Sequence, residues 1–317
     1  MDFGLYLGAA VAGPTAGPDR IRTLTLAAET LGLHSVWVPD HIVIPMEVKS
    51  TYPYAAVGVG FDPLSQEVNY DVLATLPYLA GLTRRVRLGA SVLVVPYRNP
   101  LLVAKWLASL DQLSGGRVLV GVGVGWLAEE FAALDQPHFA ARGAVTDEYI
   151  EIWKAVWSQR TIRFSGRFYR FESILAGPKP LQTPTLPIHV GGHSPAALRR
   201  AARIGAGWQP TRLGPDEIAP LVETLRSLLA EHGRRPDDVL VSARVTLDFT
   251  DRPVPAGAPA WRLTGDTAAI VAACRRYEAA GVRLLIPSPP PDASEDVELR
   301  TIERLAREVR PEFVSSA

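Results

Sequence analysis

The chain has 317 residues, of which 47% are hydrophobic and 21% are charged, and its 33 basic and 33 acidic side chains give a formal net charge of zero. This balance excludes a general electrostatic attraction to nucleic acid or to an anionic membrane, while the length allows a sizeable core or one large α/β barrel. The single cysteine, Cys274, excludes an internal disulfide and a cysteine-cluster metal site.

The start of the chain, "MDFGLYLGAAVAG", lacks the basic segment of a secretory signal, and no apolar run in the sequence is long enough to span a bilayer. We therefore expect a cytoplasmic protein. Cys274 lies in a helical pattern, which predicts a buried and unreactive thiol.

From there on, short apolar runs rich in β-branched residues alternate with segments whose apolar residues recur every three or four positions. The runs expected to form strands are 3–9, 34–38, 85–96, 117–125, 186–192, 206–210, 238–249 and 282–287. The segments expected to form helices are 20–31, 70–82, 100–115, 145–157, 195–204, 215–232, 267–280 and 297–309. Eight strand–helix units predict an α/β protein with a (β/α)8 TIM barrel, as one domain over residues 1–317, rather than an open Rossmann sheet.

Three insertions are expected on this barrel, after strands 2, 4 and 7. Ile42–Asn69 is a long connection that follows the second strand. Thr161–Ser173, in the fourth unit, alternates around Ser165-Gly166 like a small hairpin, and Asp251–Pro259 is a loop rich in proline and glycine. Long loops in compact domains often serve as lids or binding loops.

Polar residues mark the strand ends that form the active face of such a barrel. Asp40 and His41 end the second strand, where the alternatives are a turn cap beside a structural histidine and a pair that acts on a ligand. The sequence contains no H-x-H or H-E-x-x-H pattern and no G-x-S-x-G pattern, so we expect neither a catalytic metal nor a serine hydrolase.

The fourth strand carries "GVGVG", which contains Gly121, Gly123 and Gly125. Glycines in a strand indicate either a bulge or the close approach of another group, here a planar ligand. Trp126 follows and is expected to be structural. Glu129 and Glu130 are expected to form a solvated face in the first turn of a helix, with a role as catalytic acid as the alternative.

Between the fifth strand and its helix lies "GGHSP". Ser194 fits the N-cap position and Pro195 the first helical position. A capped turn requires these two residues but not the preceding Gly191 and Gly192, which would let a phosphate approach the helix start. We therefore expect an anion site here, with a simple capped turn as the alternative.

Four stretches in order carry a resemblance that covers nearly the whole chain: "SVWVPDH", "TRRVRLGASVLVVPYRNP", "LSGGRVLVGVGVGW" followed by "EEF", and "IHVGGHSPAALRRAARIGAGW". With them the chain resembles the bacterial luciferase-like superfamily of flavin-dependent (β/α)8 enzymes. More narrowly, it is similar to the branch that uses coenzyme F420, a 5-deazaflavin.

The resemblance implies a role for each matching residue. Asp40 and His41 would be catalytic and lie beside the cofactor ring, with His41 as acid/base or electrostatic partner. Ser91-Val92 would form a bulge behind the ring, often with a non-prolyl cis peptide in relatives. The remaining residues implied to bind the cofactor line the ring (Gly123, Val124, Gly125) or hold its phosphate (Gly191, Gly192, Ser194). Trp126 departs from the pattern, because the sugar-phosphate dehydrogenase relatives carry a glutamate near this position, which argues against that substrate.

The implied activity is hydride transfer between F420 and a small organic substrate. One alternative is an FMN-dependent monooxygenase on the same fold, which uses reduced flavin and oxygen, and another is a non-catalytic flavin- or deazaflavin-binding protein. We expect a homodimer, and a separate enzyme that reduces the cofactor. Six aromatic residues are candidates for the walls of a substrate pocket, although some must belong to the core: Trp37, Tyr52, Tyr54, Phe61, Tyr97 and Trp126.

Overall fold

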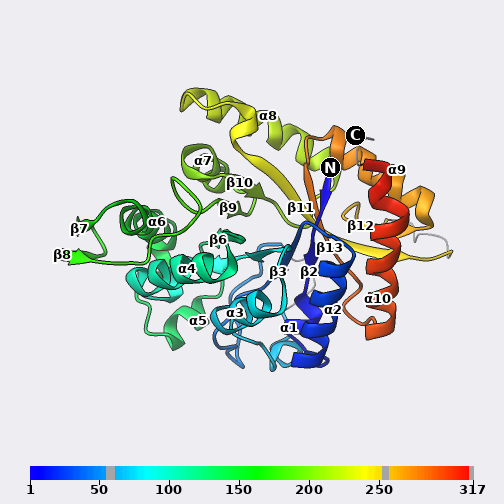
Figure 1. Ribbon diagram of the computed structural model, residues 1–317, viewed down its shortest axis with the longest axis horizontal. Coiled ribbons are helices and arrows are strands. Elements are labelled where there is room, and N and C mark those ends of the chain that lie inside the picture. Colours follow the sequence, from blue (N-terminus) through cyan, green and yellow to red (C-terminus); the bar gives the residue numbers. More distant parts are fainter. Residues whose placement is uncertain (55–60, 252–256, 314–317) are drawn as a thin grey trace.

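The computed structural model describes residues 1–54, 61–251 and 257–313, and its centre is a nearly closed barrel of parallel strands (Figure 1). The first barrel strand is interrupted: β1 (Asp2–Phe3) pairs with β13 (Leu284–Ser288), and β2 (Leu5–Tyr6) pairs with β3 (Ser35–Val38). The strands between β3 and β13 follow the order β4 (Arg87–Ala90), β6 (Val118–Gly123), β9 (Ile188–Gly191), β10 (Gly207–Gln209) and β11 (Leu240–Phe249). The predicted TIM barrel is therefore confirmed.

Helices follow the barrel strands and surround them (Figure 1). The long ones are α2 (Pro18–Thr30), α3 (Val72–Leu82), α4 (Pro100–Ser114), α6 (Arg142–Ser158), α7 (Pro195–Ile204), α8 (Pro215–Glu231), α9 (Thr267–Ala279) and α10 (Glu295–Arg304). Within the described residues, none of the helices is long and apolar enough to cross a membrane. Cys274 is buried in α9, as predicted, and burial raises the pKa of its thiol to about 12.

Local sequence sets the ends of these helices. The Asn99 side chain accepts the N–H groups of Leu101 and Leu102 at the start of α4, where Pro100 occupies the first position. Gly115 ends the same helix with φ 74°, a left-handed conformation that favours glycine.

Several short elements differ from the prediction. The first strand was expected to reach Ala9, but Gly8–Val11 forms the short helix α1. Leu7 N–H still donates to Trp37 O, whereas Leu7 O accepts the N–H groups of Ala10 and Val11 in the first helical turn. The predicted strand 85–96 is divided into β4 and β5 (Leu93–Val94), and α5 (Ala128–Ala133) contains the helical first turn expected at Glu129 and Glu130. The strand β12 (Arg262–Gly265), which pairs with β11, was not predicted.

The insertions have the expected places. β7 (Thr161–Ser165) and β8 (Arg170–Leu175) form an antiparallel hairpin that projects at the edge of the molecule (Figure 1). Among its described residues, the connection over 42–69 contains a 3-10 turn, Leu64–Gln66, and an isolated antiparallel bridge between Asn69 and Ala12. Parts of the first and third insertions, 55–60 and 252–256, lie outside the described residues.

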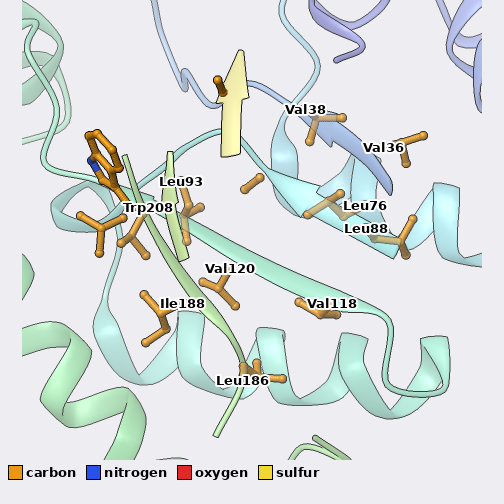
Figure 2. Packing of buried hydrophobic residues seen from close by; sticks show 14 of the residues in the cluster. Val36, Val38, Leu76, Leu88, Leu93, Val118, Val120, Leu186, Ile188 and Trp208 are labelled. Atoms are coloured by element: carbon orange, nitrogen blue, oxygen red, sulfur yellow. The ribbon is translucent and has the colours of Figure 1, made fainter. Parts of the chain in front are cut away.

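The core has two parts, one outside the barrel wall and one inside it. Outside, apolar residues of neighbouring strands, among them Val118, Val120 and Ile188, gather on the face that the helices cover (Figure 2). Inside, the rings of Trp37 and His189 meet edge to face at 5.6 Å. The neighbouring strands supply glycines, because a Cβ at Gly89 would lie 2.2 Å from the Trp37 ring and one at Gly207 2.1 Å from the His189 ring.

Candidate active site

Asp40 lies at the end of β3 and is buried, with 4% of its surface exposed. Both of its carboxylate oxygens accept from the Arg98 guanidinium at 2.8 Å, and one also accepts the Val94 N–H at 2.8 Å. Burial raises the pKa of Asp40, an effect that Arg98 and the Val94 N–H only partly offset. Asp40 therefore joins β3 to the segment after β4.

His41 has a different partner from the one its sequence neighbour suggests. Its Nδ1 lies 2.7 Å from Oε2 of Glu130, a carboxylate that is fully buried at the start of α5. The carboxylate oxygens of Asp40 accept from Arg98 and Val94, so the hydrogen-bond partner of His41 is Glu130 and not its sequence neighbour Asp40.

Glu130 collects several donors from different parts of the chain. Its Oε2 also accepts from the Tyr97 hydroxyl at 2.8 Å, and its Oε1 accepts the N–H groups of Ile42 at 2.7 Å and Val43 at 3.3 Å. Burial alone would raise the pKa of Glu130, but the His41 ring, the Ile42 N–H and the Tyr97 hydroxyl outweigh it and lower this pKa. The carboxylate is thus held in its charged form beside the imidazole.

The expectation of a solvated Glu129–Glu130 face is therefore wrong for Glu130. Consecutive helical residues point about 100° apart, so one glutamate can face the barrel while the other faces the loop. Glu129 Oε1 accepts the N–H groups of Lys49 and Ser50 at 2.8 and 3.0 Å, and its hydrogen bonding, mainly to Ser50, lowers its pKa to about 2. The two side chains together fasten the first insertion to α5.

A bulge follows β4, and its Ser91–Val92 peptide is cis, as the resemblance implies. The Ser91 hydroxyl donates to Oε1 of Gln209 at 2.6 Å. The Val92 side chain lies between two glycines, since a Cβ at Gly123 would be 2.4 Å and one at Gly191 2.7 Å from its methyl carbons. This packing makes an apolar shelf at the mouth of the barrel.

The glycines of "GVGVG" each leave room for a neighbouring group. A Cβ at Gly121 would lie 1.9 Å from the carbonyl oxygen of Ala90. Gly125 has φ 80°, and a Cβ there would lie 2.6 Å from the Phe131 ring. Contacts within the chain therefore account for glycine at these positions, and a role of Gly123, Val124 and Gly125 in binding a cofactor stays a prediction.

The turn after β9 has the predicted cap. Ser194 is the N-cap of α7 and its Oγ accepts the Ala197 N–H at 3.2 Å, with Pro195 in the first position. Gly192 has φ 92°, donates its N–H to Gln209 O at 3.1 Å, and accepts from the Trp208 indole at 2.8 Å. The capped turn is thus present, and phosphate binding by Gly191, Gly192 and Ser194 stays a prediction.

The first insertion brings aromatic side chains across this turn. The Trp126 ring contacts those of Tyr52 at 5.0 Å and Phe61 at 5.1 Å, and Tyr54 contacts His193 at 4.9 Å. The other two candidates for pocket walls are core residues: Trp37 is fully buried inside the barrel, and Tyr97 packs against Phe131 at 5.0 Å.

The residues at this end of the barrel fit a cofactor with a flat ring and a phosphate. The Val92 shelf offers an apolar surface, and α7 presents its N-terminus beside Gly192. Two buried nitrogen atoms, Nε2 of Gln209 and Nδ1 of His193, have no hydrogen-bond partner among the described residues. Buried polar atoms without a partner are rare in folded proteins, and a ligand that reaches them would satisfy them.

Comparisons with known proteins agree with this geometry. Residues 1–297 match the family model described as luciferase-like monooxygenase. An uncharacterised protein of Mycobacterium tuberculosis is 37% identical over 211 residues, 67% of this chain and 72% of that protein. An F420-dependent glucose-6-phosphate dehydrogenase of Kineococcus radiotolerans is 29% identical over 80% of this chain and 70% of its own length. An FMNH2-dependent dimethylsulfone monooxygenase of Pseudomonas putida is 32% identical over 58% of this chain and 52% of its own length.

Solved structures share the fold at low sequence identity. The monooxygenase RslO1 of Streptomyces bottropensis superposes with a TM-score of 0.79 at 22% identity, over 99% of this chain and all of that one. The coenzyme F420-dependent tetrahydromethanopterin reductase of Methanopyrus kandleri superposes with a TM-score of 0.77 at 19% identity, over 99% of both chains. The family match over residues 1–297, together with this fold, shows that the chain belongs to the luciferase-like monooxygenase family.

Proposed function

We propose that the protein is an oxidoreductase that transfers a hydride between coenzyme F420 and a small organic substrate. The observation that carries the proposal is the His41 imidazole, held by the buried Glu130 carboxylate at the barrel mouth. The choice of F420 is supported by the sequence Asp40-His41, which is part of the resemblance to the F420 branch. It is also supported by the Kineococcus relative, whose name states F420 dependence and which aligns over 80% of this chain.

When bound, the deazaflavin ring supplies the carbon that gives or accepts the hydride. The protein contributes the surroundings of the ring. Val92 and the glycines beside it form the shelf that positions a flat ring, and the turn at Gly192 and Ser194 would hold the phosphate. The aromatic side chains of the first insertion would exclude water from the site.

His41 is the group placed to hold or move a proton. Glu130 engages Nδ1, which leaves Nε2 as the ring nitrogen available to a ligand. With Nδ1 held by Glu130, His41 can balance negative charge that develops near it or pass a proton at Nε2. General acid–base catalysis of this kind contributes about 10²–10⁴-fold to a rate.

A titration of the protein with F420 and with FMN tests the proposal. We expect F420 to bind at least about ten times more tightly, which corresponds to about 1.4 kcal/mol. Tighter binding of FMN together with oxygen-dependent turnover would refute it. That outcome would favour the reduced-flavin monooxygenase, the second candidate, which the Pseudomonas relative supports. Cofactor binding without turnover across a panel of alcohols, aldehydes and enones would indicate a binding protein.

The role of His41 is tested by His41→Ala, with the exposed His232→Ala as matched control. We expect turnover to fall by about 10²–10⁴-fold for the first variant and to stay unchanged for the second. Unchanged turnover and cofactor affinity in His41→Ala would show that the assignment is wrong.

A further inference from the structure

A second feature of the barrel mouth is a cavity of about 510 Å³ on the side away from the Val92 shelf. It is lined by Tyr6 at the end of β2, by the middle of β11, by Ser288 at the end of β13, and by the segments that follow β2, β10 and β13. Pro39, the neighbour of Asp40, also lines it. The cavity therefore borders the half of the mouth where the cofactor is expected, without including the residues predicted to hold it.

The charge of the lining has one sign. Arg212, Arg244 and Arg262 line the cavity, and among the described residues that line it none is acidic. None of the three makes an ion pair with a carboxylate in the described part of the chain. Other buried or half-buried arginines of the barrel either pair with a carboxylate, as Arg98 does with Asp40, or donate to backbone carbonyls, as Arg117 does to Thr83 and Val86.

Arg244 is the most informative of the three, because it lies in the middle of β11 and is half-buried. Its guanidinium carbon lies 3.5 Å from the centre of the Tyr6 ring. Stacking on a ring fixes the plane of a guanidinium and leaves its N–H edges free to bind. A partly buried cation without an anionic partner is unfavourable for folding, so its presence calls for a ligand.

Arg212 faces the same space from the loop after β10. It has φ 55°, a left-handed conformation that is uncommon for a residue other than glycine and that clusters at ligand sites. Its guanidinium lies 5.5 Å from the centre of the Trp261 ring, and Trp261 also lines the cavity. Apolar and aromatic side chains thus alternate with the cations around one space.

We propose that this cavity binds a small organic anion, a carboxylate or phosphate on an apolar body, as the substrate of the enzyme. That the bound anion is the substrate rests on the proposed function, whereas the binding of an anion rests on the cavity alone. Guanidinium groups bind carboxylate and phosphate oxygens in pairs, and the apolar walls would take the rest of the molecule. Arg244 binds the anionic group, and Arg212 closes over it.

Calorimetric titrations without turnover test the binding. The probes are benzoate, its neutral isostere benzamide, and inorganic phosphate, each added to the free protein and to protein loaded with the cofactor that it binds. We expect benzoate to bind both forms at least ten times more tightly than benzamide. Phosphate binding without benzoate binding would reassign the ligand to phosphate esters, which is the same chemistry.

Variants locate the site. Arg244→Gln is expected to weaken benzoate binding by at least ten-fold, Arg244→Lys by less, and the exposed Arg22→Gln on α2 not at all. Thermal melting of each variant separates lost binding from lost folding. If Arg244→Gln unfolds, Arg244→Lys, which keeps the positive charge, provides the comparison.

Equal binding of benzoate and benzamide, or equal effects of Arg22→Gln and Arg244→Gln, would overturn the proposal. So would benzoate binding that is present in the free protein and absent at every concentration in the loaded protein, since the anionic side chain of the cofactor would then occupy the cavity. Because the anion titration needs neither F420 nor turnover, its failure is distinguishable from a failure of the proposed hydride transfer.

Discussion

Replacing Glu130 by glutamine tests how the mouth of the barrel is held together. Oε1 of Glu130 accepts the N–H groups of Ile42 and Val43, while Oε2 accepts from His41 and Tyr97 at 2.7 and 2.8 Å. In Glu130→Gln the amide oxygen can keep the first two bonds. The NH2 group then faces the two groups that donated to Oε2.

The size of the effect follows from this exchange. The substitution removes two hydrogen bonds to a charged group, each worth about 1.5–3 kcal/mol. The Tyr97 hydroxyl and His41 Nδ1 can instead accept from the amide, in neutral hydrogen bonds of about 0.5–1.5 kcal/mol each. The free energy of unfolding should therefore fall by about 2–3 kcal/mol. Tyr97→Phe removes only one of the bonds, so its effect should overlap with that of Glu130→Gln rather than add to it.

Urea denaturation of the wild type, both single variants and the double variant measures these values. Glu47→Gln is the control, because Glu47 is an exposed glutamate in the same insertion. A loss below about 0.5 kcal/mol for Glu130→Gln, the range of ordinary surface substitutions, would refute the reasoning, and so would full additivity of the two substitutions.

Three further predictions concern the shelf and the response to acid. Gly123→Ala should lower the free energy of unfolding by about 1–3 kcal/mol and weaken cofactor binding, because its Cβ would meet Val92 at 2.4 Å. An unchanged affinity in a cofactor titration would show that the cofactor does not lie on the Val92 shelf. Burial lowers the pKa of His189 to about 3, so the folded state resists protonation and stability should fall by about 1.4 kcal/mol per unit as the pH drops below about 6.5. Denaturation at pH 7 and pH 5 should show a larger loss in the wild type than in His189→Gln, where His34 and His193, whose pKa values burial also lowers, still contribute; equal losses in both would contradict the prediction. The pKa of Glu130 is lowered by folding, so its contribution is complete above the ordinary value of about 4.3 and is lost as the pH falls through the lower folded value, a step that should be missing in Glu130→Gln.

The sequence predicts the barrel because each barrel strand is a local pattern. The run around Val36 is apolar on both faces, as a parallel strand covered on both sides requires, and β3 is buried at all its positions. The ends of the strands follow from the alternation of strand and helix patterns along the chain. Asp40-His41 could therefore be placed at the barrel mouth without knowing which residues they contact. The Ser91–Val92 peptide was predicted only through the resemblance, since nothing local in the sequence indicates a cis bond.

The partners of these residues could not be predicted in the same way. His41 and Glu130 are separated by 89 residues and Asp40 and Arg98 by 58, and no periodicity reports contacts at such separations. A weak signal for Glu130 exists in "AEEF", because on a helix Glu130 lies closer than Glu129 to the face of the buried Phe131. The signal for the cavity is Arg244, a cation in the middle of the otherwise apolar run "VSARVTL".

The two halves of the barrel mouth are joined through Arg212. Its Nη1 donates to Tyr54 O at 3.0 Å and its guanidinium lies 5.3 Å from the centre of the Tyr52 ring, while the Tyr54 hydroxyl lies against Gly192, 2.6 Å from the place of a Cβ there. A phosphate at Gly192 must therefore displace or engage the same tyrosine that Arg212 holds. Since coupling between two ligands is reciprocal, cofactor and anion should change each other's affinity by one common factor. Benzoate titrations with and without cofactor measure that factor, which should differ from one in the wild type and approach one in Arg212→Gln. A factor of one in the wild type would show that the two halves of the barrel mouth bind their ligands independently.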